Sequence, residues 1–235
     1  MPRWIDDAMG RLCSRAYAWA CQRLYHELAW AYDWVSLLVS AGRWPHWRRL
    51  ALDFIGPGPG VELGFGTGAL LAELTHRGIG PVIGVEPSWA MQQVARRRFA
   101  RCPQPPIRLQ ARAQALPLAD ASMDWVLATF PAPYILEEKT LDECRRVLRL
   151  PTGRLVVVGL WVDLTSPWRR LMPAFYGRPS SRQVSTWEAR LVAAGFTPTW
   201  NEVVDGPARV AVLVANLAPG SQGVADGVSR EARCV

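Results

Sequence analysis

The sequence predicts an α/β fold in which a parallel sheet carries helices on both faces, and three observations support this. From residue 60 onward, short apolar runs alternate with segments that have the apolar spacing of helices. A glycine cluster, residues 64–68, joins the first run to the first such helix. The preceding loop, residues 56–60, alternates Gly and Pro, which no helix or strand interior tolerates. Such alternation of strands and helices is typical of doubly wound sheets.

Seven strands and four helices are expected from residue 56 to residue 217. The strands are predicted over residues 61–64, 81–86, 107–111, 123–129, 154–161, 197–204 and 208–216. The helices are predicted over residues 67–77, 88–100, 136–149 and 182–194. Ser88 is a suitable N-cap for the second helix. In the third helix, one face is apolar and consists of Leu141, Cys144, Val147 and Leu148.

Two further regions flank this domain. Residues 1–55 form an N-terminal lead-in with helices over residues 5–28, a second segment over residues 32–42 and a helix that starts near Pro45. Residues 218–235 are rich in Gly, Ser, Ala and charge, which predicts a flexible tail. We therefore divide the chain into a lead-in, a domain over residues 56–217 and a tail.

Composition excludes several classes of function. The charge is +7 and the only lysine is Lys139, but the arginines are scattered, and Arg96-Arg97-Arg98 is predicted to be a solvated helix face. No motif reads bases, so nucleic acid is not expected as a partner. The five cysteines form no CxxC pair, which favours reduced thiols and no metal site. No stretch reaches the roughly 20 apolar residues of a membrane span, which predicts a cytoplasmic protein with at most peripheral membrane contact.

The chain has twelve tryptophans, and several lie in the lead-in. Aromatic residues at helical spacing usually pack in a core, so Trp34, Trp44 and Trp47 are predicted to be packing residues. A Trp-rich segment next to a ligand site also suits a hydrophobic ligand.

The glycine cluster and two acids predict a ligand site. Without Cβ atoms, Gly64, Gly66 and Gly68 let backbone N–H groups approach a ligand closely. Glu62 lies near the carboxyl end of its strand, where it suits a cationic amino group, and Glu86 ends the next strand, where it can accept hydrogen bonds from two ribose hydroxyls. These features fit NAD and S-adenosylmethionine alike.

The order of four motifs distinguishes the two cofactors. Residues 62–68 (ELGFGTG), 84–88 (GVEPS) followed by Met91, 115–124 (ALPLADASMD) and 146–155 (RVLRLPTGRL) together resemble the class I S-adenosylmethionine-dependent methyltransferases. The resemblance implies a Rossmann-like, seven-stranded, mostly parallel sheet whose last strand is antiparallel. It also implies S-adenosylmethionine as cofactor and S-adenosylhomocysteine as product.

The lead-in adds a narrower resemblance. Tyr32-Asp33, Ser40-Ala41-Gly42 and Trp47-Arg48 resemble the corresponding segment of the type 11, ubiquinone/menaquinone C-methyltransferase-like enzymes and of bacterial phospholipid N-methyltransferases. In those families this segment covers the cofactor pocket and shapes the acceptor site. The acceptor that the resemblance implies is a small hydrophobic molecule, quinol-like or lipid-like.

The resemblance also assigns residues to roles. The cofactor-binding set is Tyr32, Glu62, Gly64, Phe65, Gly66, Gly68, Glu86, Pro87, Met91, Ala113, Gln114 and Thr129. One position departs from the family, because Arg112 stands where an acid commonly receives the adenine amino group, and Gln114 is the substitute acceptor. A catalytic base is needed only if the acceptor must lose a proton, and the candidates on the acceptor side are His46, Tyr134 and Asp163.

Two alternatives to a methyltransferase remain at this point: a nicotinamide-dependent oxidoreductase, and a non-catalytic protein that binds S-adenosylmethionine. The sequence leaves the acceptor atom and the oligomeric state open. The methyl-transfer hypothesis requires that Glu62 and Glu86 share one side of the sheet and that the chain's own side chains leave space between them.

Overall fold

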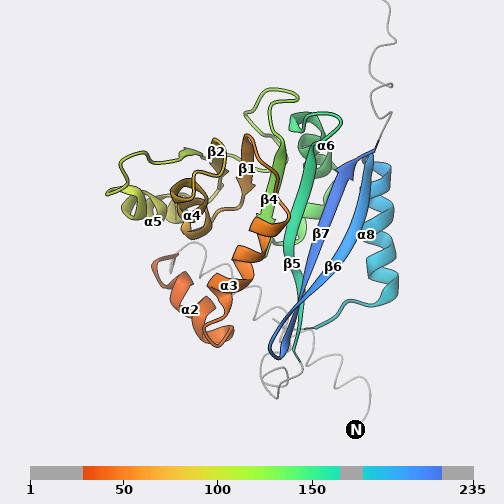
Figure 1. Cartoon of the computed structure of the whole chain (residues 1–235), viewed down its shortest axis with the longest axis horizontal. Helices are drawn as coiled ribbons and strands as arrows, with labels where there is room; N and C mark the ends of the chain where they lie inside the picture. The colour runs from red at the N-terminus through yellow and green to blue at the C-terminus, as the bar shows by residue number, and fades with distance from the viewer. Residues whose placement is uncertain (1–28, 165–176, 219–235) are drawn as a thin grey trace, which may run out of the picture.

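The computed structural model describes residues 29–164 and 177–218, and its centre is a seven-stranded sheet in the order β3-β2-β1-β4-β5-β7-β6 (Figure 1). β7 pairs antiparallel with both its neighbours, β5 and β6, and the other pairs are parallel, so the predicted seven strands and the antiparallel last strand are confirmed. The strands are β1 (Gly60–Leu63), β2 (Val82–Val85), β3 (Ile107–Leu109), β4 (Trp125–Thr129), β5 (Arg154–Leu164), β6 (Phe196–Asp205) and β7 (Ala208–Leu217).

The helices follow the predicted order with shifted ends. They are α2 (Tyr32–Val39), α3 (Trp44–Arg49), α4 (Ala69–His76), α5 (Trp89–Phe99), α6 (Glu138–Val147) and α8 (Ser181–Ala193), with short 3-10 turns η1 (Ala29–Ala31), η2 (Leu50–Asp53) and η3 (Pro133–Leu136). The Ser88 side chain accepts a hydrogen bond from the Met91 N–H, which confirms the predicted N-cap of α5. The predicted helix over 136–149 is shorter than expected, because Pro133 starts a separate 3-10 turn before α6.

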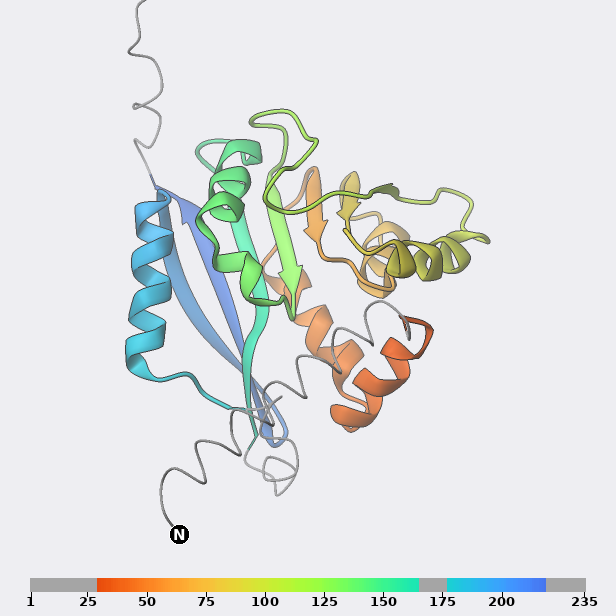
Figure 2. The same ribbon diagram turned by 180° about the vertical axis from the view of Figure 1, so that it is seen from behind.

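Helices cover the two faces of the sheet in two groups. On one face, α3, η2, α4 and α5 pack on strand side chains such as Trp125, Leu127 and Val156. On the other face, α6 and α8 pack on Val61, Leu155 and their neighbours. Figure 1 shows α3 in front of the sheet, and Figure 2, from behind, shows α6 and α8 in front. The result is a three-layer α/β/α arrangement.

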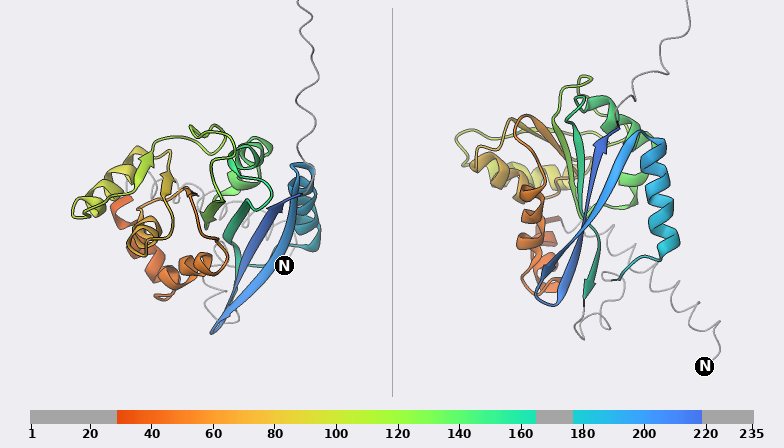
Figure 3. Two further views of the ribbon diagram at one scale, coloured as in Figure 1. Left: turned by 45° about the horizontal axis from the view of Figure 1, so that its top comes forward. Right: turned by 45° about the vertical axis from the view of Figure 1, so that its right-hand side comes forward.

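The lead-in is attached to the long β6–β7 hairpin. Asp205, at the end of β6, accepts hydrogen bonds from Arg43 Nη1 at 2.7 Å and from Trp47 Nε1 at 2.8 Å. Figure 3 shows the tip of this hairpin beside α2 and α3. Through α3 and the residue before it, the lead-in therefore contacts the β6–β7 hairpin.

The tryptophans of the lead-in do not share one role. Trp47 is buried, as predicted, and Trp44 is half-buried and stacks on Phe130 with ring centroids 4.0 Å apart. The prediction for Trp34 was wrong, because its side chain is 69% exposed on the outer face of α2. The helices predicted over residues 5–28 and the predicted tail from residue 219 onward lie outside the described residues.

Candidate functional site

The two predicted carboxylates meet on one face of the sheet. β1 and β2 are adjacent and parallel, and Glu62 lies opposite Gly84 in the register. Side chains alternate along a strand, so Glu86, two residues beyond Gly84, projects to the same side as Glu62. Both are nearly inaccessible, with exposed fractions of 1% and 2%. The first requirement of the methyl-transfer hypothesis is confirmed.

The glycine corner brings backbone N–H groups to these carboxylates. Glu86 accepts hydrogen bonds from Gly66 N–H at 3.0 Å and from Ser88 N–H at 2.8 Å. Gly66 has a φ of +56°, and no atom lies within 4 Å of the place where its Cβ would stand. Glycine suits this position because a larger residue rarely adopts a positive φ, and it adds no side chain beside the carboxylates.

A small cavity lies beside Glu62, at the carboxyl ends of β1 and β4. Its lining residues are Tyr32, Trp44, Arg48, Glu62, Gly64, Phe65, Gly66, Thr67 and Thr129. Its volume is only about 20 Å³, enough for a single water molecule. Tyr32, Trp44 and Arg48 of the lead-in line this cavity together with Glu62, so a nucleotide-sized ligand can enter only if they move.

Among the described residues, three buried polar atoms of side chains around this cavity have no hydrogen-bond partner. They are two donors, Trp44 Nε1 and Arg48 Nε, and one acceptor, Glu62 Oε2. A buried polar atom without a partner costs about 1–3 kcal/mol, so folded proteins rarely keep several together without a function for them.

The charge state of Glu62 reflects this environment. Burial raises its pKa to about 8, the positive charge of Arg48 acts in the opposite direction, and the negative charge of Glu86 adds to the increase. Burial also lowers the pKa of Arg48. Glu62 is thus a buried acid that an additional cation would convert to its charged form.

A polar cluster fastens α2 to the glycine corner. The Thr67 hydroxyl donates to both oxygens of Asp33, at 2.9 and 3.0 Å. Arg98 donates from Nη2 to Asp33 at 2.5 Å and from Nε to the Thr67 carbonyl at 2.9 Å. Arg96, Arg97 and Arg98 are all exposed, as predicted, and Arg98 in addition connects α5 with the lead-in.

Six of the predicted cofactor residues line the cavity: Tyr32, Glu62, Gly64, Phe65, Gly66 and Thr129. The others lie around it or on neighbouring loops. Gly68 precedes α4 with a φ of +74°, Met91 is fully buried in α5, and Pro87 is exposed. After β3, Ala113 is buried, and Gln114 donates from Nε2 to Glu137 at 2.8 Å.

Of the three acceptor-side candidates, only Tyr134 lies at the glycine corner. A Cβ added to Gly64 would stand 2.6 Å from the Tyr134 hydroxyl. Burial raises the pKa of Tyr134, and the charges of Glu86 and Glu62 raise it further. His46 is exposed on α3, and Asp163 lies on the extension of β5 opposite Arg209, so neither lines the cavity.

Sequence reasoning missed the roles of Asp33, Thr67, Trp44 and Arg48. Each is polar or aromatic and lies in a segment that the sequence singled out, either the lead-in or the glycine cluster. Their positions at the cavity depend on the contact between α2, α3 and the strand ends, for which periodicity carries no signal.

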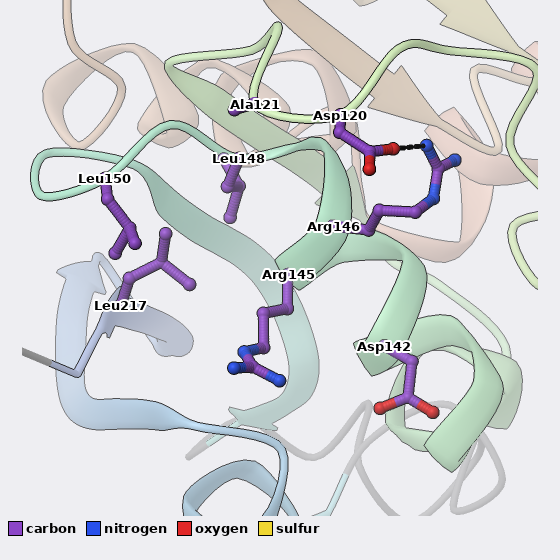
Figure 4. A pocket seen from close by; sticks show the side chains of 8 residues that line it. All are labelled: Asp120, Ala121, Asp142, Arg145, Arg146, Leu148, Leu150 and Leu217. Carbon is purple, nitrogen blue, oxygen red and sulfur yellow. Dashed lines mark hydrogen bonds and ion pairs between the residues drawn. The ribbon is translucent and has the colours of Figure 1, made fainter. Parts of the chain in front are cut away.

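A larger pocket of about 360 Å³ lies elsewhere (Figure 4). Its walls include Asp120, Arg145, Leu150 and Leu217, so it lies at the amino ends of the parallel strands. Open α/β sheets bind ligands at the opposite, carboxyl ends. The small cavity beside Glu62 is therefore the candidate active site.

The comparisons with known proteins agree with this position. A family model described as "Methyltransferase domain" matches residues 61–157, which contain both carboxylates and the glycine corner. The chain is 32% identical over 171 residues to a demethylmenaquinone methyltransferase of Renibacterium salmoninarum, covering 67% of this chain and 69% of that protein. The chain belongs to the class I S-adenosylmethionine-dependent methyltransferases. Their cofactor, S-adenosylmethionine, is its cofactor.

Other relatives are similar over a smaller part of their length. The demethylmenaquinone methyltransferase of Thermus thermophilus is 37% identical, but the match spans 57% of this chain and 63% of that protein, less than two thirds. Among solved structures, geranyl diphosphate C-methyltransferase from Streptomyces coelicolor, in complex with S-adenosyl-L-homocysteine, has a TM-score of 0.56 at 15% identity. It covers 74% of this chain and 79% of that chain, and shows that the fold is shared.

The side chains at the strand ends fit the cofactor of this methyltransferase family. Glu62 Oε2 is an acceptor with no hydrogen-bond partner among the described residues, which suits an ammonium group, and Gly66 places no side chain beside it. Within the described residues, no helix has the length and apolar character to cross a membrane. In that same part of the chain, no three His, Cys, Asp or Glu side chains are grouped to hold a metal ion.

Proposed function

We propose that the protein transfers a methyl group from S-adenosylmethionine to a small hydrophobic acceptor of the quinol type. The observation that carries the proposal is the buried Glu62 carboxylate, which has an oxygen without a partner beside the glycine corner. Relatives at 32% and 37% identity are named demethylmenaquinone methyltransferases, which supports a quinol-like acceptor. The aromatic lead-in next to the cavity supports a hydrophobic one.

Each part of the cofactor has a counterpart among the predicted residues. Glu62 binds the ammonium group of the amino acid part. Glu86 accepts hydrogen bonds from the two ribose hydroxyls, and in doing so gives up one of its two present hydrogen bonds from backbone N–H groups. Gln114 and the backbone of Ala113 meet the adenine amino group in place of the acid that Arg112 replaces.

The sulfonium of the bound cofactor supplies an activated methyl group. The chain contributes position: the acceptor must lie about 3 Å from that carbon, in line with the leaving sulfur. Thr129, at the end of β4, and Tyr32, from α2, border this position. Phe130 stacks on Trp44 and keeps water from that side, which favours a reaction in which positive charge is lost.

Glu62 is assigned to the ammonium group of the cofactor, and the other described residues that line the cavity include no carboxylate or imidazole to act as a general base for the acceptor. Tyr134 has a raised pKa and therefore stays protonated, so its hydroxyl orients the acceptor by hydrogen bonding. His46 and Asp163 lie away from the cavity. An acceptor that is already partly ionised at the working pH, such as a quinol whose pKa is close to that pH, suits this arrangement best, because it needs no base from the protein.

The direct test is transfer of a labelled methyl group to a demethylated menaquinol, with S-adenosylhomocysteine binding measured by calorimetry in parallel. Wild type is expected to bind S-adenosylhomocysteine and to methylate the quinol. Glu62→Gln is expected to lose more than about tenfold in affinity, because a neutral amide replaces the carboxylate. Glu138→Gln, on the exposed start of α6, is the matched control and should behave as wild type.

Two results would contradict the proposal in different ways. Absence of S-adenosylhomocysteine binding would remove the cofactor assignment from this site. Tight binding without turnover on quinol, phospholipid and amine acceptors would favour the non-catalytic alternative.

The same proposal includes peripheral contact with a membrane surface, where quinols reside. Trp30, Trp34 and Leu38 follow one another at four-residue spacing and are 67%, 69% and 76% exposed. Such a stripe suits the interfacial region of a bilayer. The double variant Trp34→Ser, Leu38→Ser should reduce cosedimentation with phosphatidylglycerol vesicles. The control is Val192→Ser on α8, an apolar side chain that is 61% exposed, and it should not reduce cosedimentation. Equal vesicle binding by all three proteins would contradict this part.

A further inference from the structure

The unpaired atoms of the cavity have complementary chemistry. One is a carboxylate oxygen, on Glu62, and two are N–H donors, Trp44 Nε1 and Arg48 Nε. They come from two separate parts of the chain, since Glu62 ends β1 and the two donors lie in α3. All three side chains line the same small cavity.

This set matches the two charged groups of an α-amino acid. An ammonium group requires acceptors, which Glu62 provides, and a carboxylate requires donors, which Arg48 and Trp44 provide. Asp33 does not neutralise Arg48 closely, because the shortest distance between their charged atoms is 4.0 Å. The guanidinium therefore keeps its Nε–H for another anion.

We propose that Arg48 and Trp44 bind the carboxylate of the cofactor's amino acid part, opposite Glu62, which binds its ammonium group. This inference rests on the proposed function, and it makes the lead-in a part of the cofactor site rather than only a cover. The cavity of about 20 Å³ must widen to hold this part of the cofactor, which requires the lining side chain of Arg48 to move. The binding energy of the carboxylate then holds α3 against the strand ends.

The neighbouring residue Arg49 provides a matched control. It lies next to Arg48 on α3, but its side chain is half-exposed and donates to Glu73 on the surface at 2.8 and 2.9 Å. It does not line the cavity. For the indole, the control is Trp34, which is exposed on α2.

The test is isothermal calorimetry with three ligands that differ in the amino acid part: S-adenosylhomocysteine, its decarboxylated analogue, and 5′-methylthioadenosine, which lacks both charged groups. Arg48→Met is expected to weaken S-adenosylhomocysteine binding by about 10- to 100-fold. Trp44→Phe should weaken it by about three- to tenfold, because one neutral hydrogen bond is lost. Neither variant should change the affinity for 5′-methylthioadenosine by more than about twofold, and Arg49→Met and Trp34→Phe should match wild type for all three ligands.

The decarboxylated analogue separates a carboxylate site from a general effect of positive charge. Wild type should prefer S-adenosylhomocysteine to this analogue, and in Arg48→Met the preference should disappear. If Arg48→Met weakened all three ligands equally, Arg48 would only support the fold, and the inference would be wrong. The same holds if Arg48→Met changed none of the affinities. If wild type bound none of the three, the proposed function itself would fail.

Discussion

The hydroxyl of Thr67 donates to both carboxylate oxygens of Asp33, so the glycine corner and α2 are joined directly above the cavity. Asp33 also accepts a hydrogen bond from Arg98 of α5. One acidic side chain thus holds together the lead-in, the glycine corner and the second helix of the domain. Because the cavity is closed by the same lead-in, this contact controls access to it.

Asp33→Asn should loosen the lead-in. The amide keeps the shape of the side chain but loses the charge that Arg98 contacts, which costs about 1–3 kcal/mol for a charge-assisted bond. Hydrogen exchange of the backbone amides in residues 32–39 is expected to accelerate, and S-adenosylhomocysteine is expected to associate faster. Asp53→Asn, an exposed acid in η2, is the control. Unchanged exchange in α2 would show that Asp33 does not hold it.

The stability of the fold should depend on the ionisation of Glu62. Its pKa in the folded protein is raised to about 8, so the folded state holds a proton that the unfolded chain releases near its ordinary pKa of about 4.5. This contribution is fully present below about pH 4.5 and is lost as the pH rises to about 8, by at most about 1.4 kcal/mol per pH unit. Urea unfolding from pH 5 to pH 8 should therefore show a steeper loss for wild type than for Glu62→Gln. If the free energy of unfolding fell equally with pH in both proteins, the raised pKa of Glu62 would be contradicted.

The affinity for S-adenosylhomocysteine should rise with pH over the same range. Binding of its ammonium group requires the charged form of Glu62, which Arg48 favours and Glu86 disfavours. Below pH 8, each pH unit should lower the affinity by up to about tenfold. Above pH 8 the ligand's own amine loses its proton, so the affinity passes through a maximum. Glu62→Gln should show no rise from pH 6 to pH 8, and 5′-methylthioadenosine binding to wild type should be independent of pH. If the affinity rose with pH in Glu62→Gln, or for 5′-methylthioadenosine in wild type, a group other than Glu62 would cause the pH dependence.

Gly159→Ala should destabilise the wall of the site formed by Phe130. Gly159 has a φ of +78°, and an added Cβ would stand 2.3 Å from the Phe130 ring. Phe130 itself has a φ of +49°, so the ring has little freedom to move away. We expect a loss of about 2 kcal/mol or more in the free energy of unfolding. Gly177→Ala, where no atom lies within 4 Å, should change it by less than about 1 kcal/mol. If both variants lost similar amounts of unfolding free energy, the contact between Gly159 and the Phe130 ring would not be the cause.

The sheet was predictable because each strand has its own apolar run and each helix its own turn signals. The register that places Glu62 and Glu86 on one face follows from parallel pairing of adjacent strands, which the alternating order implies. The closure of the cavity was not predictable. It depends on where α3 packs, and that is decided by distant partners such as Asp205, which lies 158 residues from Trp47 along the chain.

The tryptophans illustrate the same limit. Helical spacing places Trp34 and Trp47 in amphipathic segments but does not state which face meets the sheet. Trp47 turned inward because its indole reaches Asp205, and Trp34 remained outside. Arg98 is exposed, as its position in a run of three arginines suggests, but the sequence does not show that its guanidinium also donates to Asp33 of α2 and to the Thr67 carbonyl.

The two acids that fasten the lead-in differ in what surrounds them. At Asp205, Arg43 and Trp47 lower the pKa although burial acts to raise it, and both donors come from the segment around α3. Asp33 fastens α2 to the edge of the cavity. The two contacts are separate, so opening of the one at Asp33 would leave α3 attached to the β6–β7 hairpin through Asp205.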